Sequence, residues 1–126
     1  MSLDIKEIDD QHQQFLKILN DLYDAFYQMR YKDELQGLLR QLCAFADYHF
    51  ATEEKYFDLF KYDHEKEHKQ IHAKLGTEIQ SFIERFERGE TDLIADLMDF
   101  LEDWLVNHLQ TEDKRYVACF HEHGLH

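Results

Sequence analysis

The sequence predicts an all-α fold, an antiparallel up-down-up-down four-helix bundle with a metal site in its core. Three observations lead to this prediction. The 126-residue chain contains no proline and only four glycines, so little interrupts a helical backbone. Apolar residues recur at spacings of three and four along four separate stretches. The connectors between these stretches are short, and short connectors place consecutive helices antiparallel.

The first helix is expected from about Asp10 to Tyr31, with Asp9 as its N-cap. The second is expected from near Asp33 to about Phe60. The apolar stripe of the first helix consists of Ile8, Phe15, Leu16, Leu19, Leu22, Tyr23 and Phe26. That of the second consists of Leu35, Leu38, Leu42, Phe45 and Ala46.

The third helix is expected to start near Asp63 and to end at Arg88-Gly89, because a basic residue followed by glycine often stops a helix. The fourth is expected to begin after Thr91. The stripe of the third helix consists of Ile79, Phe82, Ile83 and Phe86. That of the fourth consists of Ile94, Leu97, Leu101, Trp104 and Leu105.

Composition excludes several classes of partner. The net charge of -13 argues against a nucleic-acid partner and against binding to an anionic membrane surface. The length and the 44% hydrophobic content fit one domain over residues 1–126, expected to be a monomer or a weak homo-oligomer. Cys43 and Cys119 form no Cys-x-x-Cys motif, and no apolar run resembles a signal peptide or a membrane span. A reducing cytoplasm is therefore the expected location.

Ionisable residues interrupt all four apolar stripes. They form the pairs His-x-x-x-Glu, His-x-x-x-His and His-x-x-x-x-Asp, together with one further histidine. The seven residues are His12, His49, Glu53, His68, His72, His108 and Asp113. Burying one such group without a partner costs roughly a few kcal/mol, and a bare carboxylate costs more. A lone histidine on an apolar face is usually a core residue, but five imidazoles and two carboxylates together can hold two metal ions.

The spacings of two of the three pairs fit metal binding from one face of a helix, and the spacing of the third does not. Residues four apart in an α-helix are separated by about 40° around the axis and about 6 Å along it. His68 and His72 can thus bind one ion from one face, and Glu53 is free to bridge two. Residues five apart are separated by about 140°. His108 and Asp113 therefore lie on different sides of their helix unless that helix is distorted.

Four segments resemble the hemerythrins, specifically the bacterial hemerythrin-like proteins. They are Ile8-Asp-Asp-Gln-His12, His49-Phe-Ala-Thr-Glu53, His68-Lys-Gln-Ile-His72 and Trp104-Leu-Val-Asn-His108-Leu-Gln-Thr-Glu-Asp113. All seven family ligand positions are present, in order and at family spacing, in a match over residues 8–116. The resemblance implies a non-haem di-iron protein that binds O2 reversibly, for storage, delivery or sensing. It implies no dedicated enzyme, with at most a weak side peroxidase or oxidase activity.

The resemblance also implies roles for individual residues. One iron would take His68, His72 and His108, and the other His12 and His49. Glu53 and Asp113 would bridge the irons together with an oxo or hydroxo group. The two-histidine iron would keep a position open for O2, or for other small anions and gases. An apolar O2 pocket is expected to be lined by Phe50, Trp104, Leu105 and Leu109.

Two alternative functions remain open at this point. Many stand-alone bacterial members carry an N-terminal arm with a tryptophan before the first histidine. Here only eleven residues precede His12 and Trp104 is the only tryptophan, so the chain could also be an O2, redox or iron sensor domain of a larger protein. A ferritin-like di-iron oxidase or peroxidase would need two Glu-x-x-His motifs and two further glutamates, and only Glu65-Lys-Glu-His68 fits.

Two further histidine patterns have weaker interpretations. His64-Glu-Lys-Glu-His68 matches the His-Glu-x-x-His pattern of zinc proteases, but His68 already belongs to the pair with His72. The tail histidines His121, His123 and His126 match no ligand motif, so a solvated tail is expected there.

Overall fold

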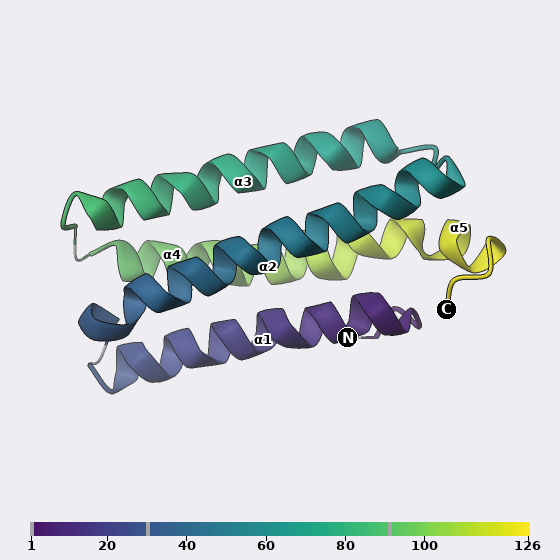
Figure 1. Ribbon diagram of the computed structural model, residues 1–126. Coiled ribbons are helices and arrows are strands. Elements are labelled where there is room, and N and C mark those ends of the chain that lie inside the picture. Colours follow the sequence, from purple (N-terminus) through teal and green to yellow (C-terminus); the bar gives the residue numbers. More distant parts are fainter. Residues whose placement is uncertain (1, 30, 91) are drawn as a thin grey trace.

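The computed structural model describes residues 2–29, 31–90 and 92–126 and has the predicted antiparallel four-helix bundle (Figure 1). Helices that follow one another in the chain run in opposite directions, and both chain ends lie at the same end of the bundle (Figure 1). The described residues contain no strand. The bundle helices are α1 (Lys6–Tyr27), α2 (Tyr31–Phe60), α3 (Glu65–Glu87) and α4 (Leu93–Asp103).

The fourth helix is not a regular α-helix along its whole length. Beyond α4 the chain continues as a π-helix, η1 (Trp104–Glu112), and then as a 3-10 helix, η2 (Asp113–Tyr116). The short helix α5 (Val117–Glu122) follows and covers the end of the bundle where the termini lie (Figure 1). The change of helix type falls on the segment that carries His108 and Asp113.

The ends of α1 differ from the prediction. Asp9 is not the N-cap, since the helix begins at Lys6 after the extended residue Ile5. The Asp9 carboxylate instead accepts hydrogen bonds from the Leu3 backbone N–H at 2.8 Å and from the Ser2 hydroxyl at 2.9 Å. It therefore ties the N-terminal segment to the side of the helix. At the other end α1 stops at Tyr27 rather than at Tyr31, and the chain turns at Met29, whose φ is +56°.

The predicted stop of α3 at Arg88-Gly89 is confirmed. Gly89 has a φ of +82°, which only glycine adopts without strain. Its N–H donates to the carbonyl of Phe86, and the N–H of Glu90 donates to that of Arg85. These two bonds form a Schellman motif. The start of α4 at Leu93 is close to the predicted one, whereas Thr91 lies outside the described residues.

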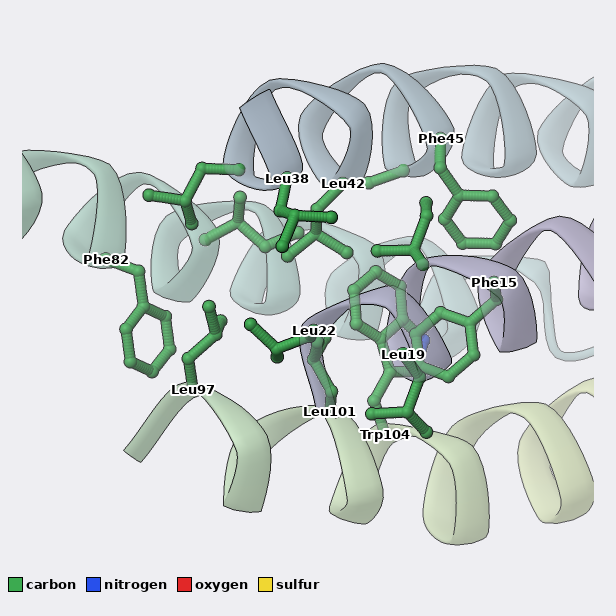
Figure 2. Packing of buried hydrophobic residues seen from close by; sticks show 14 of the residues in the cluster. Phe15, Leu19, Leu22, Leu38, Leu42, Phe45, Phe82, Leu97, Leu101 and Trp104 are labelled. Atoms are coloured by element: carbon green, nitrogen blue, oxygen red, sulfur yellow. The ribbon is translucent and has the colours of Figure 1, made fainter. Parts of the chain in front are cut away.

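Two separate apolar clusters stabilise the bundle. The larger one fills the half away from the termini with side chains from all four helices, among them Phe15, Leu42, Phe82 and Trp104 (Figure 2). The smaller one lies at the end where the termini meet and consists of Leu3, Ile5, Ile8, Phe57, Tyr62, Tyr116 and Phe120. On α1 the candidate ligand His12 lies between Ile8 of the smaller cluster and Phe15 of the larger one, and on α2 Glu53 lies between Phe50 and Phe57 in the same way.

Two sequence expectations can be compared with the structure directly. Cys43 and Cys119 are both free thiols. Within the described ranges, no helix combines the length and the apolar character that a membrane crossing requires.

The larger cluster provides a first prediction. Leu42 is 1% exposed, so Leu42→Ala should lower the free energy of unfolding by about 2–5 kcal/mol through lost burial and the cavity left behind. Leu59 lies on the same helix and is 66% exposed, so Leu59→Ala should change it by less than about 0.5 kcal/mol. Urea unfolding followed by circular dichroism measures both values. Equal losses in the two variants would contradict the assigned core.

Candidate metal centre

The structure brings all seven predicted residues together in one buried layer across the bundle. None of the seven residues is more than 3% exposed. The helices α1, α2 and α3 and the segment that continues α4 all contribute, so that residues separated by up to 101 positions in the sequence are in contact. The layer consists of His12 from α1, His49 and Glu53 from α2, His68 and His72 from α3, His108 from η1 and Asp113 from η2.

The Asp113 carboxylate lies between two pairs of histidines. Its Oδ2 is 3.2 Å from Nε2 of His12 and 3.1 Å from Nε2 of His49. Its Oδ1 is 3.1 Å from Nε2 of His68 and 3.1 Å from Nε2 of His108. The two oxygens of one carboxylate thus face two different groups of imidazoles, which is the arrangement that a bridging ligand needs.

The Glu53 carboxylate is the second central group. Its Oε1 lies 2.9 Å from Nε2 of His72, 3.3 Å from that of His49 and 3.6 Å from that of His68. Its Oε2 is buried and has no hydrogen-bond partner among the described residues. Glu53 therefore lies close to histidines of α2, α3 and η1 and retains an unused oxygen inside the protein.

The π-helix η1 explains how His108 and Asp113 reach the same layer. The backbone N–H of Asp113 donates to the carbonyl oxygen of His108, a bond that spans five residues instead of four. This wider turn brings residues five apart onto one side of the helix. The distortion that the His-x-x-x-x-Asp spacing required is therefore present, in the segment where it is needed.

A chain of hydrogen bonds fixes which nitrogen of His49 carries the proton. The Thr52 hydroxyl donates to the Tyr48 carbonyl at 2.9 Å, so its oxygen accepts the amide N–H of Gln11 at 3.0 Å. The other end of that amide, Oε1, then faces Nδ1 of His49 at 2.7 Å and must accept from it. With its proton on Nδ1, the His49 ring directs the lone pair of Nε2 into the layer.

His72 is oriented in the same way by a carboxylate. Its Nδ1 lies 2.8 Å from Oε2 of Glu54, a group that accepts hydrogen bonds and donates none when ionised. The proton is therefore on Nδ1, and the lone pair of Nε2 faces Glu53. Sequence reasoning missed Gln11, Thr52 and Glu54. For Gln11 a signal existed, because it falls at the spacing of Ile8 and Phe15 as a polar residue on an apolar stripe.

The donors of the layer fit bound metal ions. Lone pairs of neutral imidazoles face lone pairs of carboxylates at about hydrogen-bond distance, an arrangement that is repulsive unless a cation or a proton lies between them. Several buried atoms have no hydrogen-bond partner, namely Oε2 of Glu53, Oδ1 of Asp113 and Nε2 of His68 and His108. Imidazoles with a few carboxylates are ligands that iron and other transition metals accept. Two overlapping sets could each hold an ion: Glu53, His68, His72 and His108, and His49, Glu53, His108 and Asp113.

Without metal, the charges of the layer shift the pKa values of its members. Burial and the Asp113 charge would raise the pKa of Glu53, but His49, His68 and His72 outweigh them and lower it to about 2. Burial would lower the pKa of His68, but Asp113 and Glu53 raise it to about 9. The pKa of Asp113 is also held well below its usual value by histidines, against the effect of burial. Protons thus replace metal ions as partners of the carboxylates, and metal binding must release them.

Aromatic rings cover the histidines from both clusters. The Phe50 ring stacks on that of His72 with centroids 4.1 Å apart, and Phe45 stacks on His49 at 5.3 Å. From the smaller cluster, Phe57 meets His68 edge to face at 4.9 Å. Tyr116 is fully buried beside the same histidine, at 5.8 Å. The surroundings of the layer are therefore largely apolar.

The four residues expected to line an O2 pocket lie on the side of the larger cluster. Trp104 and Leu109 are buried, and Leu105 is half-buried against the same cluster. The Trp104 ring lies 5.8 Å from that of Phe50 and 6.3 Å from that of His108. They lie next to the histidines of the layer, and their role as the lining of an O2 pocket stays a prediction. Phe45, which stacks on His49, was not among the expected residues.

The competing motifs do not join the layer. His64 is half-exposed, and its Nδ1 lies 3.9 Å from the Glu67 carboxylate. The Glu65 side chain is 36% exposed and lies 3.6 Å from the Lys69 ammonium group. The zinc-protease pattern and the Glu-x-x-His motif thus each contribute only His68 to the buried cluster.

The chain is similar to one protein family over most of its length. Residues 3–120 match the family of the hemerythrin HHE cation binding domain. A bacteriohemerythrin of Pseudomonas aeruginosa (strain UCBPP-PA14) is 31% identical over 113 residues, which cover 90% of this chain and 72% of the relative. A bacteriohemerythrin of Clostridium acetobutylicum is 28% identical over 120 residues, 91% of this chain and 92% of the relative. Myohemerythrin-1 of Phascolopsis gouldii is 31% identical over 80 residues, 64% of this chain and 61% of the relative.

The raised pKa of His68 predicts how stability depends on pH in the metal-free protein. The folded protein holds this proton up to about pH 9, whereas the ordinary pKa is 6.5. The ion pairs of His68 with Asp113 and Glu53 therefore stabilise the folded protein fully below about pH 6.5. This contribution to the free energy of unfolding is lost as the pH rises through about 9. The melting temperature of chelator-treated protein should fall between pH 6.5 and 9.

A His68→Gln variant, also metal-free, is the matched control for this pH dependence. It lacks the titrating group, so its melting temperature should fall less over the same interval. A melting temperature of the metal-free wild type that rises from pH 6.5 to 9 would contradict the assignment.

Proposed function

Since the chain belongs to the hemerythrin family, we propose that it holds two non-haem iron ions and binds O2 reversibly, for storage, delivery or sensing. The observation that carries this proposal is the buried layer of five imidazoles and two carboxylates, whose members face one another across four helices. When bound, two ferrous ions supply the electrons that hold O2 reversibly. What the chain itself contributes follows from the residues around them.

The division of the ligands between the two irons follows the contacts of Asp113. Its Oδ2 faces His12 and His49, which would serve one iron. Its Oδ1 faces His68 and His108, which would serve the other. His72 would join the second group, through its position at Glu53 and on the same helix face as His68. Glu53 and Asp113 would then bridge the two irons, together with an oxo or hydroxo group.

The open position at the two-histidine iron is where O2, or another small anion or gas, would bind. The protein orients His49 there through Gln11 and Thr52, so that its lone pair is directed inward before any metal arrives. Phe50, Trp104, Leu105 and Leu109 would exclude water and proton donors from the bound gas. Exclusion of protons favours release of O2 as O2 over its conversion to hydrogen peroxide.

The composition of the ligand set favours a carrier or sensor over a dedicated oxidase. A ferritin-like di-iron enzyme uses Glu-x-x-His motifs on two helices with additional glutamates. Here the layer contains two carboxylates, and Glu65 lies outside it at 36% exposure. A histidine-rich centre with few anionic ligands stabilises high oxidation states of iron less well than a carboxylate-rich one. Side peroxidase activity would remain weak.

Iron content tests the ligand assignment. Wild-type protein should contain two irons per chain by elemental analysis, and its anaerobic absorption spectrum should change reversibly on addition of O2. Asp113→Ala removes the carboxylate that faces both histidine groups, so this variant should retain clearly less than two irons. Glu112→Gln changes the neighbouring carboxylate, which accepts from Arg115 at 3.1 Å, and should retain both irons. One metal per chain in the wild type, or two irons in Asp113→Ala, would refute the assignment.

The apolar pocket provides a separate prediction. Leu109 is fully buried beside the layer but has no ligand atom, so Leu109→Glu should keep iron while admitting protons and water. The oxygenated form should then decay several-fold faster than in the wild type, because the apolar side chain would no longer exclude water and proton donors from the site. The decay is followed by absorption at constant pH. Leu109→Met conserves volume and should decay at nearly the wild-type rate.

A second substitution tests the same prediction in case Leu109→Glu does not fold. Trp104→Ala opens the same side of the layer without adding a charge and should also shorten the lifetime of the oxygenated form. Wild-type decay rates in both variants, at full iron content and helicity, would show that these residues do not protect the bound gas.

A further inference from the structure

We infer that Glu54 is a positioning residue that makes His72 the most strongly electron-donating histidine of the centre and lowers the reduction potential of the iron bound by His72. This inference rests on the proposed di-iron function. It concerns a residue that is not itself a ligand and that acts through His72 alone. The carboxylate lies on α2, whereas the imidazole lies on α3, so the contact also fixes the two helices relative to each other.

The contact is short and directional. Oε2 of Glu54 lies 2.8 Å from Nδ1 of His72, whose opposite nitrogen, Nε2, faces Glu53 at 2.9 Å. The imidazole is 3% exposed, and the Glu54 side chain is 36% exposed. The hydrogen bond to the carboxylate is thus shielded from solvent on the histidine side, while the carboxylate itself is partly solvated.

The other histidines of the layer lack such a partner within the part of the chain that the structure describes. Nδ1 of His49 donates to a neutral amide oxygen, that of Gln11, at 2.7 Å. Nδ1 of His12 and Nδ1 of His108 are buried without a hydrogen-bond partner. For His68 the ion pairs of the structure involve Nε2. The centre is therefore asymmetric: an anion supports one histidine, and a neutral amide supports another.

The hydrogen bond from Nδ1 to the carboxylate changes the electron density of the His72 ring. A carboxylate that accepts the Nδ1 proton draws it away from the imidazole and increases electron density at Nε2. A more electron-rich ligand stabilises Fe3+ more than Fe2+, because the ion with the higher positive charge gains more. In the couple Fe3+ plus one electron giving Fe2+, the electron comes from a soluble redox mediator and no bond is made or broken in the protein. Glu54 thus shifts this equilibrium towards Fe3+.

Glu54→Gln tests the inference because it keeps a hydrogen-bond acceptor of the same length and removes the charge. The iron-loaded protein is titrated potentiometrically with mediators. Iron content should remain at two per chain, and the equilibrium should move towards Fe2+ about tenfold, which corresponds to a rise in potential of about 59 mV for a one-electron couple.

Two matched variants separate this effect from a general change of charge. Asp58→Asn removes a carboxylate one helical turn further along α2 that binds Lys69 at 2.7 Å and contacts no histidine of the layer, so its potential should equal that of the wild type. Gln11→Glu places a carboxylate on His49 and should lower the potential of the other iron, the one that His49 would bind. An unchanged potential in Glu54→Gln at full iron content, or an equal rise in Asp58→Asn, would overturn the inference.

A second readout does not depend on iron. Zinc is redox-inert and diamagnetic, so nuclear magnetic resonance of the zinc-loaded protein can observe the Nδ1 proton of His72. In the wild type this proton should appear strongly deshielded, and in Glu54→Gln its resonance should move upfield. An identical resonance in both proteins would overturn the assigned hydrogen bond. A wild type that binds zinc in this way but never two irons would refute the di-iron function and leave the role of Glu54 on His72 supported.

Discussion

The whole structure depends on one costly arrangement, a layer of seven ionisable side chains that crosses the interior of a four-helix bundle. The layer separates the larger apolar cluster from the smaller one, so the bundle has no continuous apolar core. The five histidines and two acidic residues of the layer are each at most 3% exposed, and each buried ionisable group would cost free energy if left without a partner. Two divalent cations would bring four positive charges to the position where two carboxylates and the imidazole lone pairs converge. Bound metal would therefore stabilise the fold at the layer where the apolar core is interrupted.

The geometry of this layer is also linked to the backbone conformation of the fourth helical segment. Two helices supply ligand pairs four residues apart, a spacing that a regular α-helix places on one face. The fourth segment supplies His108 and Asp113 five apart, and it becomes a π-helix, with the hydrogen bond from Asp113 N–H to the His108 carbonyl. Such a turn is rare and is found mostly at functional sites, where a gain elsewhere compensates for weaker backbone geometry. Here the gain is that Asp113 contacts histidines from α1, α2, α3 and η1.

The sequence predicted the parts of the molecule that follow from periodicity. Four helices, their inner faces and the convergence of the seven residues all derive from the spacing of apolar and ionisable positions along the chain, and the helix stop at Gly89 derives from local backbone preference. Contacts between distant segments were not predictable in the same way. Asp9 has the side chain of an N-cap, yet it binds the Leu3 backbone because the N-terminal segment folds back onto α1. Glu54 follows a ligand and resembles any exposed helical glutamate until α3 brings His72 to 2.8 Å from it. The residues of the O2 pocket stay a prediction, since packing beside the histidines does not by itself define a path for a gas.

The smaller cluster explains how the layer is closed on the side of the chain ends. It combines Ile5 and Ile8 from the N-terminal part with Phe57 of α2 and with Tyr116 and Phe120 from the C-terminal part, and all five are fully buried. The two terminal segments are joined directly, because Nε2 of His121 lies 3.0 Å from the carbonyl oxygen of Asp4. Tyr116 then stacks on Phe120 at 4.3 Å and lies beside His68. Water can be excluded from the histidines on this side only while both segments remain packed, so the apolar surroundings of the centre depend on contacts between residues more than one hundred positions apart in the sequence.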